Sequence, residues 1–261
     1  MQTRSSWQVT RNVWHAMFMR EALARTMSDR FAAFWMLAEP VLFVMIMIGV
    51  RQLLGRVRVI AGADFIPWLL VGLMTFFLFR DGMTRAMGAI NANKALFAYR
   101  QVKPVDTVLV RCALEGLLKT MVLVILLVGA ALLGHDTFPD NPLGTLFIWG
   151  SVWLLGTGIG LVVSVGATLI PEVEKIVRMM AIPLMLISGA ILPVNFLRHD
   201  IQEFVLYNPI LHGIELIRLQ FFHRYVTLSG VDLLYLYYWA LGSIALGLLL
   251  HVKFSIRLKA Q

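Results

Sequence analysis

The chain has 261 residues, 59% of them hydrophobic, a mean hydropathy of +0.78 and a net charge of +8. Soluble domains contain roughly 45–50% apolar residues, so this composition excludes an ordinary soluble domain and indicates a polytopic membrane protein. The positive charge is no sign of nucleic-acid binding, because Lys and Arg collect in the cytoplasmic loops of membrane proteins. A single cysteine, Cys112, excludes an intrachain disulfide and a cysteine-based zinc site.

The N-terminal 30 residues carry five arginines and lack the long apolar region of a cleavable signal peptide. Between residues 5 and 28, apolar residues that include Trp7, Trp14 and Phe18 recur at helical spacing. This pattern predicts a helix in 1–30 that lies in the headgroup plane of the membrane. A solvated basic tail is the alternative, and the two tryptophans argue against it.

Apolar runs predict an all-α polytopic membrane protein with six transmembrane helices, because one span needs about 20 helical residues. We place all of them in one transmembrane domain, 1–261, with five spans in 31–192 and the sixth in 231–252. The second run, 65–79, is too short to cross unless it continues through Arg80 and Arg85. The spans are expected at about 31–50, 65–89, 111–133, 143–170, 177–192 and 233–250.

The distribution of Lys and Arg predicts the orientation. With both termini in the cytoplasm, the inside segments carry 16 of these residues and the outside segments carry 6. This difference indicates cytoplasmic N- and C-termini and places 193–230 outside.

Several ionisable residues fall within the expected spans, where charge is costly unless it faces protein or water. Glu39 precedes Pro40, which kinks a helix, so its carboxyl group either lines a cavity or bonds to a neighbouring helix. Asp81 and Arg85 are spaced as an i, i+4 pair. Together with Arg80 they suggest one of two roles. They form a basic mouth, that is, a positively charged cytosolic entrance for an anionic substrate, or the two arginines are long cationic side chains that reach to the membrane interface.

Two further patterns favour a structural role. Glu115 and Lys119 have the spacing of a pair that neutralises itself within one helix. Gly156, Gly160 and Ser164 repeat every four residues, which predicts a face for close helix packing.

Segment 193–230 is too apolar for an ordinary loop and too interrupted for a span. Pro193 and the Asn208-Pro209 pair break it, and it also contains charged residues. On the cytoplasmic side, 91–106 is short and basic, carries Phe97 and Tyr99, and has the composition of a docking helix. The segment 171–178 is a compact charged turn.

Sequence motifs for catalysis are missing. The chain has no G-x-x-x-x-G-K-[ST] for ATP and no H-E-x-x-H. His212 and Glu215 form a lone H-x-x-E, which does not predict a metal site. The chain therefore moves or conducts a substrate, or acts as a scaffold.

Two stretches resemble a known family: FWMLAEPVLF in the first span and SGAILPVNFLRHDIQEFVLYNPILHGIELIR before the last. They look like the permease subunits of ABC-2 type exporters, and are most similar to capsular polysaccharide export permeases of the KpsM type. The more specific part is the N-P-x-x-H-x-I-E-x-x-R pattern. Its residues, together with the preceding proline, are Pro193, Asn208, Pro209, His212, Glu215 and Arg218.

The resemblance implies a homodimer that pairs with two separate ATPase subunits, which bind ATP and Mg, while this chain carries no cofactor. The ATPase-coupling residues would be Lys94, Phe97, Tyr99, Arg100, Glu172 and Glu174. The segment 193–230 would form a re-entrant helical hairpin on the outer side. Glu39, Arg80 and Arg85 would lie along the substrate path.

The implied substrate is a lipid-linked acidic glycan moved from cytosol to periplasm across a bacterial inner membrane, with periplasmic export components as further partners and no nucleic acid. An O-antigen or teichoic-acid exporter of the same architecture is the alternative. Two further alternatives belong to other classes of protein: an ATP-independent channel or carrier, and a membrane-embedded enzyme.

Overall fold

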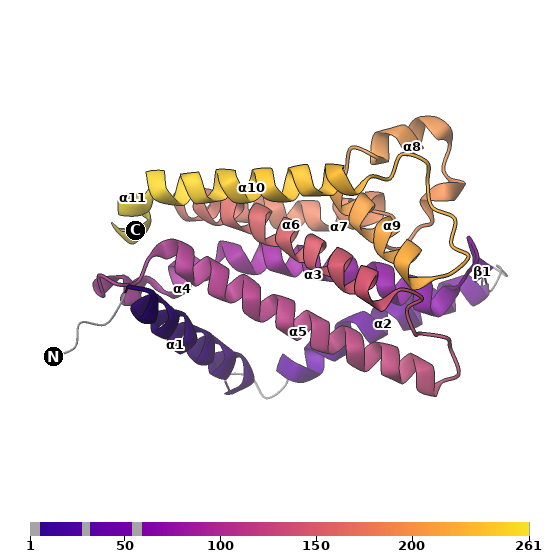
Figure 1. Cartoon of the computed structure of the whole chain (residues 1–261), viewed down its shortest axis with the longest axis horizontal. Helices are drawn as coiled ribbons and strands as arrows, with labels where there is room; N and C mark the ends of the chain where they lie inside the picture. The colour runs from indigo at the N-terminus through magenta and orange to yellow at the C-terminus, as the bar shows by residue number, and fades with distance from the viewer. Residues whose placement is uncertain (1–5, 28–31, 54–58, 261) are drawn as a thin grey trace.

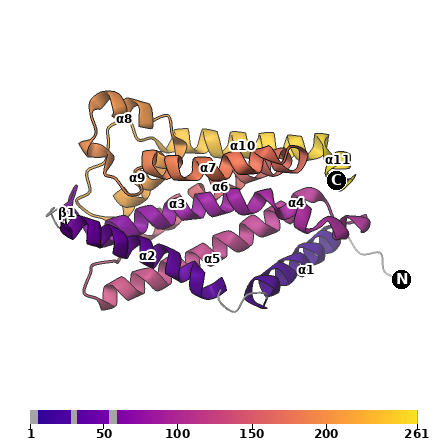
Figure 2. The ribbon, with the colours of Figure 1, turned by 180° about the vertical axis from the view of Figure 1, so that it is seen from behind.

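Helix α3 (Phe65–Met87) forms the centre of the computed structural model, which describes residues 6–27, 32–53 and 59–260. Most of its side chains are buried, because α5, α6, α9 and α2 pack around it (Figures 1 and 2). Apart from two short strands, the described elements are helices. They are α1 (Ser6–Met27), α2 (Ala32–Leu53), α4 (Ala89–Ala92), η1 (Lys94–Ala98), α5 (Pro104–Leu132), α6 (Pro142–Leu169), α7 (Glu172–Ile187), η2 (Val194–Phe196), α8 (His199–Val205), α9 (Pro209–Phe221), α10 (Leu233–Lys253) and α11 (Ser255–Ala260).

Four helices in the described part of the chain are long and apolar enough to cross a membrane: α3, α5, α6 and α10. The prediction of a helical multi-pass membrane protein is therefore confirmed. The apolar part of α2 covers Phe34–Val50, and α7 has 16 residues, so both are shorter than these four. Six spans stay a prediction.

Two expected boundaries were wrong. Helix α5 begins at Pro104 rather than near Arg111, because proline suits the first helical position and the Lys103 amide donates to Asp106 Oδ2 over 3.0 Å. Helix α7 ends at Ile187 rather than Leu192. The chain turns two residues later at Gly189, whose φ of +73° suits glycine.

A small hairpin precedes α3 and was not expected in an all-α chain. Strand β1 (Val59–Ile60) pairs antiparallel with β2 (Ala63–Asp64) through a turn in which Gly62 has a φ of +92°. A Cβ at Gly62 would lie 2.3 Å from the Arg224 carbonyl oxygen. The Val226 amide also donates to the Ala61 carbonyl over 3.2 Å, so the hairpin supports the segment that follows α9.

Helix α1 confirms the predicted N-terminal helix. Trp14 Nε1 donates to Asp106 Oδ1 over 3.0 Å, and Glu21 lies 2.5 Å from Arg111. Arg25 pairs with Glu115, one turn further along α5. These contacts place α1 along the first turns of α5 (Figure 1), and its location in the headgroup plane stays a prediction.

The small-residue face of α6 packs as predicted. A Cβ on Gly156 would lie 3.0 Å from the Phe79 carbonyl oxygen, and one on Gly160 would lie 2.9 Å from the Ala86 Cβ. The third member, Ser164, lies 3.1 Å from His251 Nε2 on α10. The glycines therefore allow α6 to approach α3 closely.

Replacing Gly160 should test this packing. We expect Gly160→Leu to destabilise the protein by about 1–3 kcal/mol, because the added side chain has no space against α3. Gly150→Leu on the same helix is the control, since a Cβ there meets nothing within 4 Å. The measurement is the thermal unfolding midpoint in detergent, and equal midpoints for both variants would contradict the packing.

Candidate functional site

The first candidate residues lie in a chain of charges that joins α2, α3 and α5. Arg80 lies 2.8 Å from Glu39 Oε1 and 2.7 Å from Asp81 Oδ1. Lys119 on α5 lies 2.6 Å from the other oxygen of Asp81. Both cations also face the ring of Phe77, Arg80 at 4.3 Å and Lys119 at 5.6 Å. Since partners satisfy Glu39 and Arg80, this group holds helices together.

The structure corrects two predicted pairs. Asp81 pairs with Arg80 and Lys119, and not with Arg85 on its own helix. Glu115 does not neutralise Lys119. It pairs with Arg25 of α1 and lies 3.8 Å from Arg85 Nε. In both cases the carboxylate pairs with a side chain on a neighbouring helix, and not with the residue one turn away on its own helix.

Arg25 and Arg85 meet at the buried Glu115 near the α1–α5 contact. Burial lowers the pKa of Arg25 to about 10, and repulsion from Arg85 and Arg111 adds to this effect. The guanidinium therefore stays charged at neutral pH. The side chain of Arg85 is 52% exposed, against 21% for Arg80. Of the two arginines expected in a basic mouth, Arg85 is the accessible one.

The expected coupling segment is shorter and less helical than predicted. Residues 91–106 hold the end of α4, the 3₁₀ turn η1 and the start of α5, and not a continuous docking helix. Lys94, Tyr99 and Arg100 are exposed. Phe97 is half-buried and packs near Met17 and Val102. Asn93, which sequence reasoning missed, accepts a hydrogen bond from Arg20 of α1.

The second coupling turn lies at the start of α7. Glu172 is exposed, and Glu174 pairs with Arg178 over 2.7 Å. The two coupling segments lie at the same end of the molecule, because α4 contacts α6, which leads into α7.

The N-P-x-x-H-x-I-E-x-x-R residues form a single buried unit. Asn208 caps α9 by accepting from the Ile210 amide over 3.2 Å, and Pro209 takes the first helical position. His212 Nδ1 accepts from the Asp232 amide over 2.9 Å, so the neutral ring carries its proton on Nε2. That nitrogen donates to the Leu206 carbonyl over 2.8 Å. One histidine thus connects the segments before and after α9. Pro193 lies just before η2.

Arg218 is the most buried charge of this unit, with no exposed side-chain surface. Its Nη1 donates to the Gly189 carbonyl over 2.8 Å and lies 3.0 Å from Glu215 Oε1. Its Nη2 donates to the Ala190 carbonyl over 3.1 Å. The guanidinium stacks 3.7 Å from the centre of the Trp68 ring on α3. Arg218 therefore satisfies carbonyls just beyond α7, where the chain has left the helix.

The carboxylate of Glu215 is satisfied from the segment after α9. Tyr225 donates to it over 3.0 Å, and Thr227 donates over 2.9 Å. Burial raises the pKa of Tyr225 to about 12, so the hydroxyl keeps its proton at neutral pH. Trp68 Nε1 lies 3.3 Å from the Tyr225 oxygen. Trp68, Tyr225 and Thr227 were not predicted, because each looks like an ordinary aromatic or polar residue in sequence.

Close packing leaves no spare volume beside Arg218. A Cβ on Gly72 of α3 would lie 2.1 Å from Arg218 Nη2. The residues around Arg218 thus hold segments of the chain together and do not form an open binding site. No group of three or more His, Cys, Asp or Glu residues that could hold a metal occurs in the described part of the chain.

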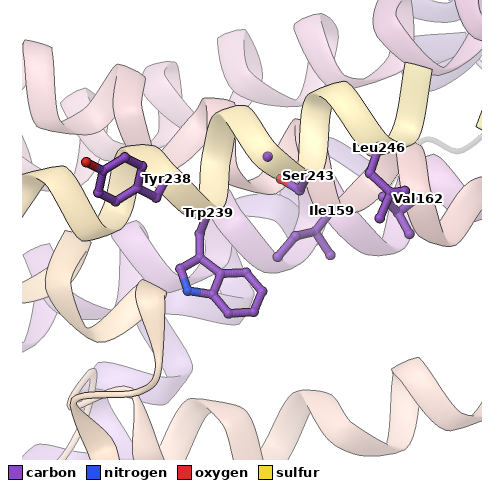
Figure 3. Close-up of a pocket in the computed structure, with 7 residues that line it drawn as sticks. Ile159, Val162, Tyr238, Trp239, Ser243 and Leu246 are labelled. Carbon is purple, nitrogen blue, oxygen red and sulfur yellow. The ribbon is translucent and has the colours of Figure 1, made fainter. Parts of the chain in front are cut away.

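A groove of about 530 Å³ lies on the outer face of α6 and α10 (Figure 3). Tyr238 and Trp239 lie at one end, and Val162 and Leu246 lie at the other. Its lining residues carry no charge, so it offers an anionic cargo no cationic partner.

These features define a helical multi-pass membrane protein in which a buried ion pair holds α9 against its neighbours and further charge pairs join the other helices. The family model described as "ABC-2 type transporter" matches residues 12–222, and the chain belongs to this family. The resemblance noted in the sequence is therefore confirmed.

Three relatives extend over most of the chain. The polysialic acid transport protein KpsM of Escherichia coli is 32% identical over 250 residues, which cover 95% of each chain. The capsule polysaccharide export inner-membrane protein CtrC of Neisseria meningitidis is 26% identical, with 84% of this chain and 82% of CtrC covered. BexB of Haemophilus influenzae, which has the same description, is 25% identical with 99% and 97% covered.

Arg218→Lys should test whether geometry or charge matters at this position. Lysine keeps the charge but cannot reach both backbone carbonyls and Glu215 with a planar fork. We expect a clearly lower unfolding midpoint, and a loss of about 3–5 kcal/mol for Arg218→Ala, which leaves Glu215 unpaired. Arg198→Lys is the matched control, because that side chain is 80% exposed in the same segment. A midpoint for Arg218→Lys equal to that of the control would contradict the role.

Proposed function

We propose that this chain is the membrane-spanning subunit of an ATP-driven exporter that moves lipid-linked capsular polysaccharide from cytosol to periplasm. The observation that carries the proposal is the match to the polysialic acid transport protein KpsM, which covers 95% of both chains, and to the capsule polysaccharide export proteins CtrC and BexB. These relatives match most of the length of this chain and not one motif alone, so we extend their substrate class to it. A bacterial inner-membrane location follows from the same relatives.

In this proposal α2 and α7 are the two remaining spans. The apolar part of α2, Phe34–Val50, would reach about 26 Å, and α7 about 24 Å, against a hydrocarbon core of about 30 Å. Six crossings are supported by the first turn of α1 and by α11, which lie at the same end of the molecule (Figure 1). The excess of Lys and Arg in the segments at that end supports a cytoplasmic location for both.

The segment 193–230 is proposed to enter the outer leaflet and return. Helix α9 would reach only about 20 Å, too little to cross, yet most of its side chains are buried against α3, α6 and α10. Non-helical backbone at membrane depth is tolerated only where protein or water covers it. The bonds from Arg218 to the Gly189 and Ala190 carbonyls supply such cover.

Energy would come from two separate ATPase subunits, which bind ATP and Mg, because this chain has no phosphate-binding loop of the Walker type. A second copy of the chain would complete the permease. The ATPase contact would use the exposed Lys94, Tyr99 and Arg100 and the turn with Glu172 and Glu174. Periplasmic export components would receive the polymer.

Deleting the gene in its native host tests the function. The expected result is loss of capsular polymer from the surface and its accumulation in the cytosol, measured by fractionation with glycan staining. Loss of O-antigen or teichoic acid with a normal capsule would favour the alternative substrates. A normal surface glycan profile would contradict an export role.

The coupling surface gives a second prediction. Tyr99 is 67% exposed and Phe97 is half-buried, so their substitutions should differ. Tyr99→Ala should reduce co-purification of the ATPase at least about tenfold, a value in the range of interface hot spots, without lowering the unfolding midpoint. Phe97→Ala should lower both the co-purification of the ATPase and the unfolding midpoint. If Tyr99→Ala leaves co-purification unchanged, Tyr99 does not seat the ATPase.

The basic mouth, formed by Arg80 and Arg85, gives a third prediction. Arg85 is the exposed arginine, so Arg85→Ala should lower surface polymer without changing stability, because the anionic headgroup or first sugars of the substrate lose a bidentate partner. Arg85→Lys should restore export only partly. Arg80→Ala should instead lower stability, since it frees Glu39 and Asp81. Arg257→Ala, another exposed arginine at this end, is the control. Full export with Arg85→Lys would contradict substrate contact.

A further inference from the structure

A second apolar groove, of about 410 Å³, lies between α2 and α5 with α3 as its floor. It is separate from the coupling surface and from the charge pairs. The side chains of Met45, Ile125 and Leu133 at the groove are at least half exposed, so it opens to the surroundings of the bundle. The lining residues are Leu37, Pro40, Val41, Val44, Met45, Ile48, Ile66, Leu70, Ile125, Leu126, Gly129, Ala130, Leu133 and His135.

The groove occupies one half of the membrane thickness. Its α5 residues lie in the last turns of that helix, and its α3 residues, Ile66 and Leu70, lie in the first turns of α3. From Ile125 to Leu133, α5 rises about 12 Å, close to the half-thickness of about 15 Å of a hydrocarbon core. The groove therefore has the length of one leaflet and ends at the β1–β2 side.

Space inside the groove is available and apolar. A Cβ added to Gly129 meets nothing within 4 Å, so no side chain of the described residues fills that part of the groove. In a bilayer, the material that would fill it is an acyl chain.

The end of the groove near the β1–β2 hairpin is polar, whereas its walls are apolar. His135 Nδ1 lies 2.6 Å from Asp64 Oδ2, and this ion pair is partly exposed. The neighbouring Asp136 is also exposed. Carboxylates bind an ammonium group, and they repel a phosphate group that no nearby ammonium balances. A headgroup that contains both groups complements this end better than a purely anionic one. The α6–α10 groove, by contrast, has no charged lining residue.

We propose that this groove binds one zwitterionic aminophospholipid of the phosphatidylethanolamine class, from the leaflet on the β1–β2 side. One acyl chain lies along α5 past Gly129, and the headgroup lies at His135, Asp64 and Asp136. The lipid fills the space between α2 and α5, so it supports α2, which otherwise makes few contacts with α5.

The test uses the full chain reconstituted in vesicles with equal amounts of phosphatidylethanolamine and phosphatidylglycerol, then extracted in a mild detergent. Native mass spectrometry counts the retained phospholipids. We expect about one phosphatidylethanolamine per chain for the unchanged protein. Gly129→Leu should reduce it about tenfold, which corresponds to about 1.4 kcal/mol.

Gly150→Leu is the matched control, because it adds the same side chain in open space on α6, away from this groove. It should retain the lipid as the unchanged protein does. Asp64→Asn should reduce the preference for phosphatidylethanolamine over phosphatidylglycerol while leaving the acyl chain bound. Unfolding midpoints equal to that of the unchanged protein would show that both leucine variants are folded.

Three outcomes would overturn the proposal. They are equal retention by Gly129→Leu and Gly150→Leu, a preference of the unchanged protein for phosphatidylglycerol, and no lipid retained above the level of random co-extraction. None of them bears on glycan export, which the surface polymer of the deletion strain measures separately.

Discussion

The buried guanidinium of Arg218 makes the contacts on which the half of the structure around α9 depends. It lies between the chain just beyond α7, the Trp68 ring on α3 and the Glu215 carboxylate on its own helix. A buried charge is tolerated only when it is paired and hydrogen-bonded, so these segments must keep their relative positions. Tyr225 and Thr227 extend the constraint to the segment after α9. The carbonyls of Gly189 and Ala190, where the chain has left α7, are therefore bonded inside the protein, as the proposed re-entrant position requires.

The half of the bundle near the termini follows the same rule with different partners. Glu39, Arg80, Asp81 and Lys119 connect α2, α3 and α5, while Arg25 and Glu115 connect α1 to α5. Because each charge is costly to leave alone in an apolar environment, the pairs specify which helices are neighbours. The proposed accessible cation, Arg85, stands next to this network. A contact with an anionic substrate there would act on residues that already join helices, which offers a physical link between binding and movement.

The positions of the helices were largely predictable from the sequence, whereas the partners of the charged side chains were not. The bounds of α3, α6 and α10 follow from the length of their apolar runs, and the close face at Gly160 follows from four-residue spacing. Spacing could not identify the partner of Glu115, because Lys119 on its own helix and Arg25 on α1 both carry the right charge and only packing decides. The motif with Asn208, His212, Glu215 and Arg218 was recognised by resemblance. Its dependence on Trp68 and Tyr225 needed the fold, since Trp68 lies 150 residues before Arg218 and no sequence pattern marks the Tyr225 hydroxyl as a donor to Glu215, 10 residues earlier.

Transport in proteoliposomes tests most directly whether this chain forms the membrane path of an ATP-driven glycan exporter. The chain and its ATPase would be reconstituted with the ATPase outside, and a labelled lipid-linked capsular polysaccharide would be supplied in the outer leaflet. We predict that ATP and Mg make a growing fraction of the label resistant to a glycosidase added outside, and that the fraction stays at background with a non-hydrolysable nucleotide. Label that stays fully digestible while the complex hydrolyses ATP, or that becomes protected without ATP, would contradict the account.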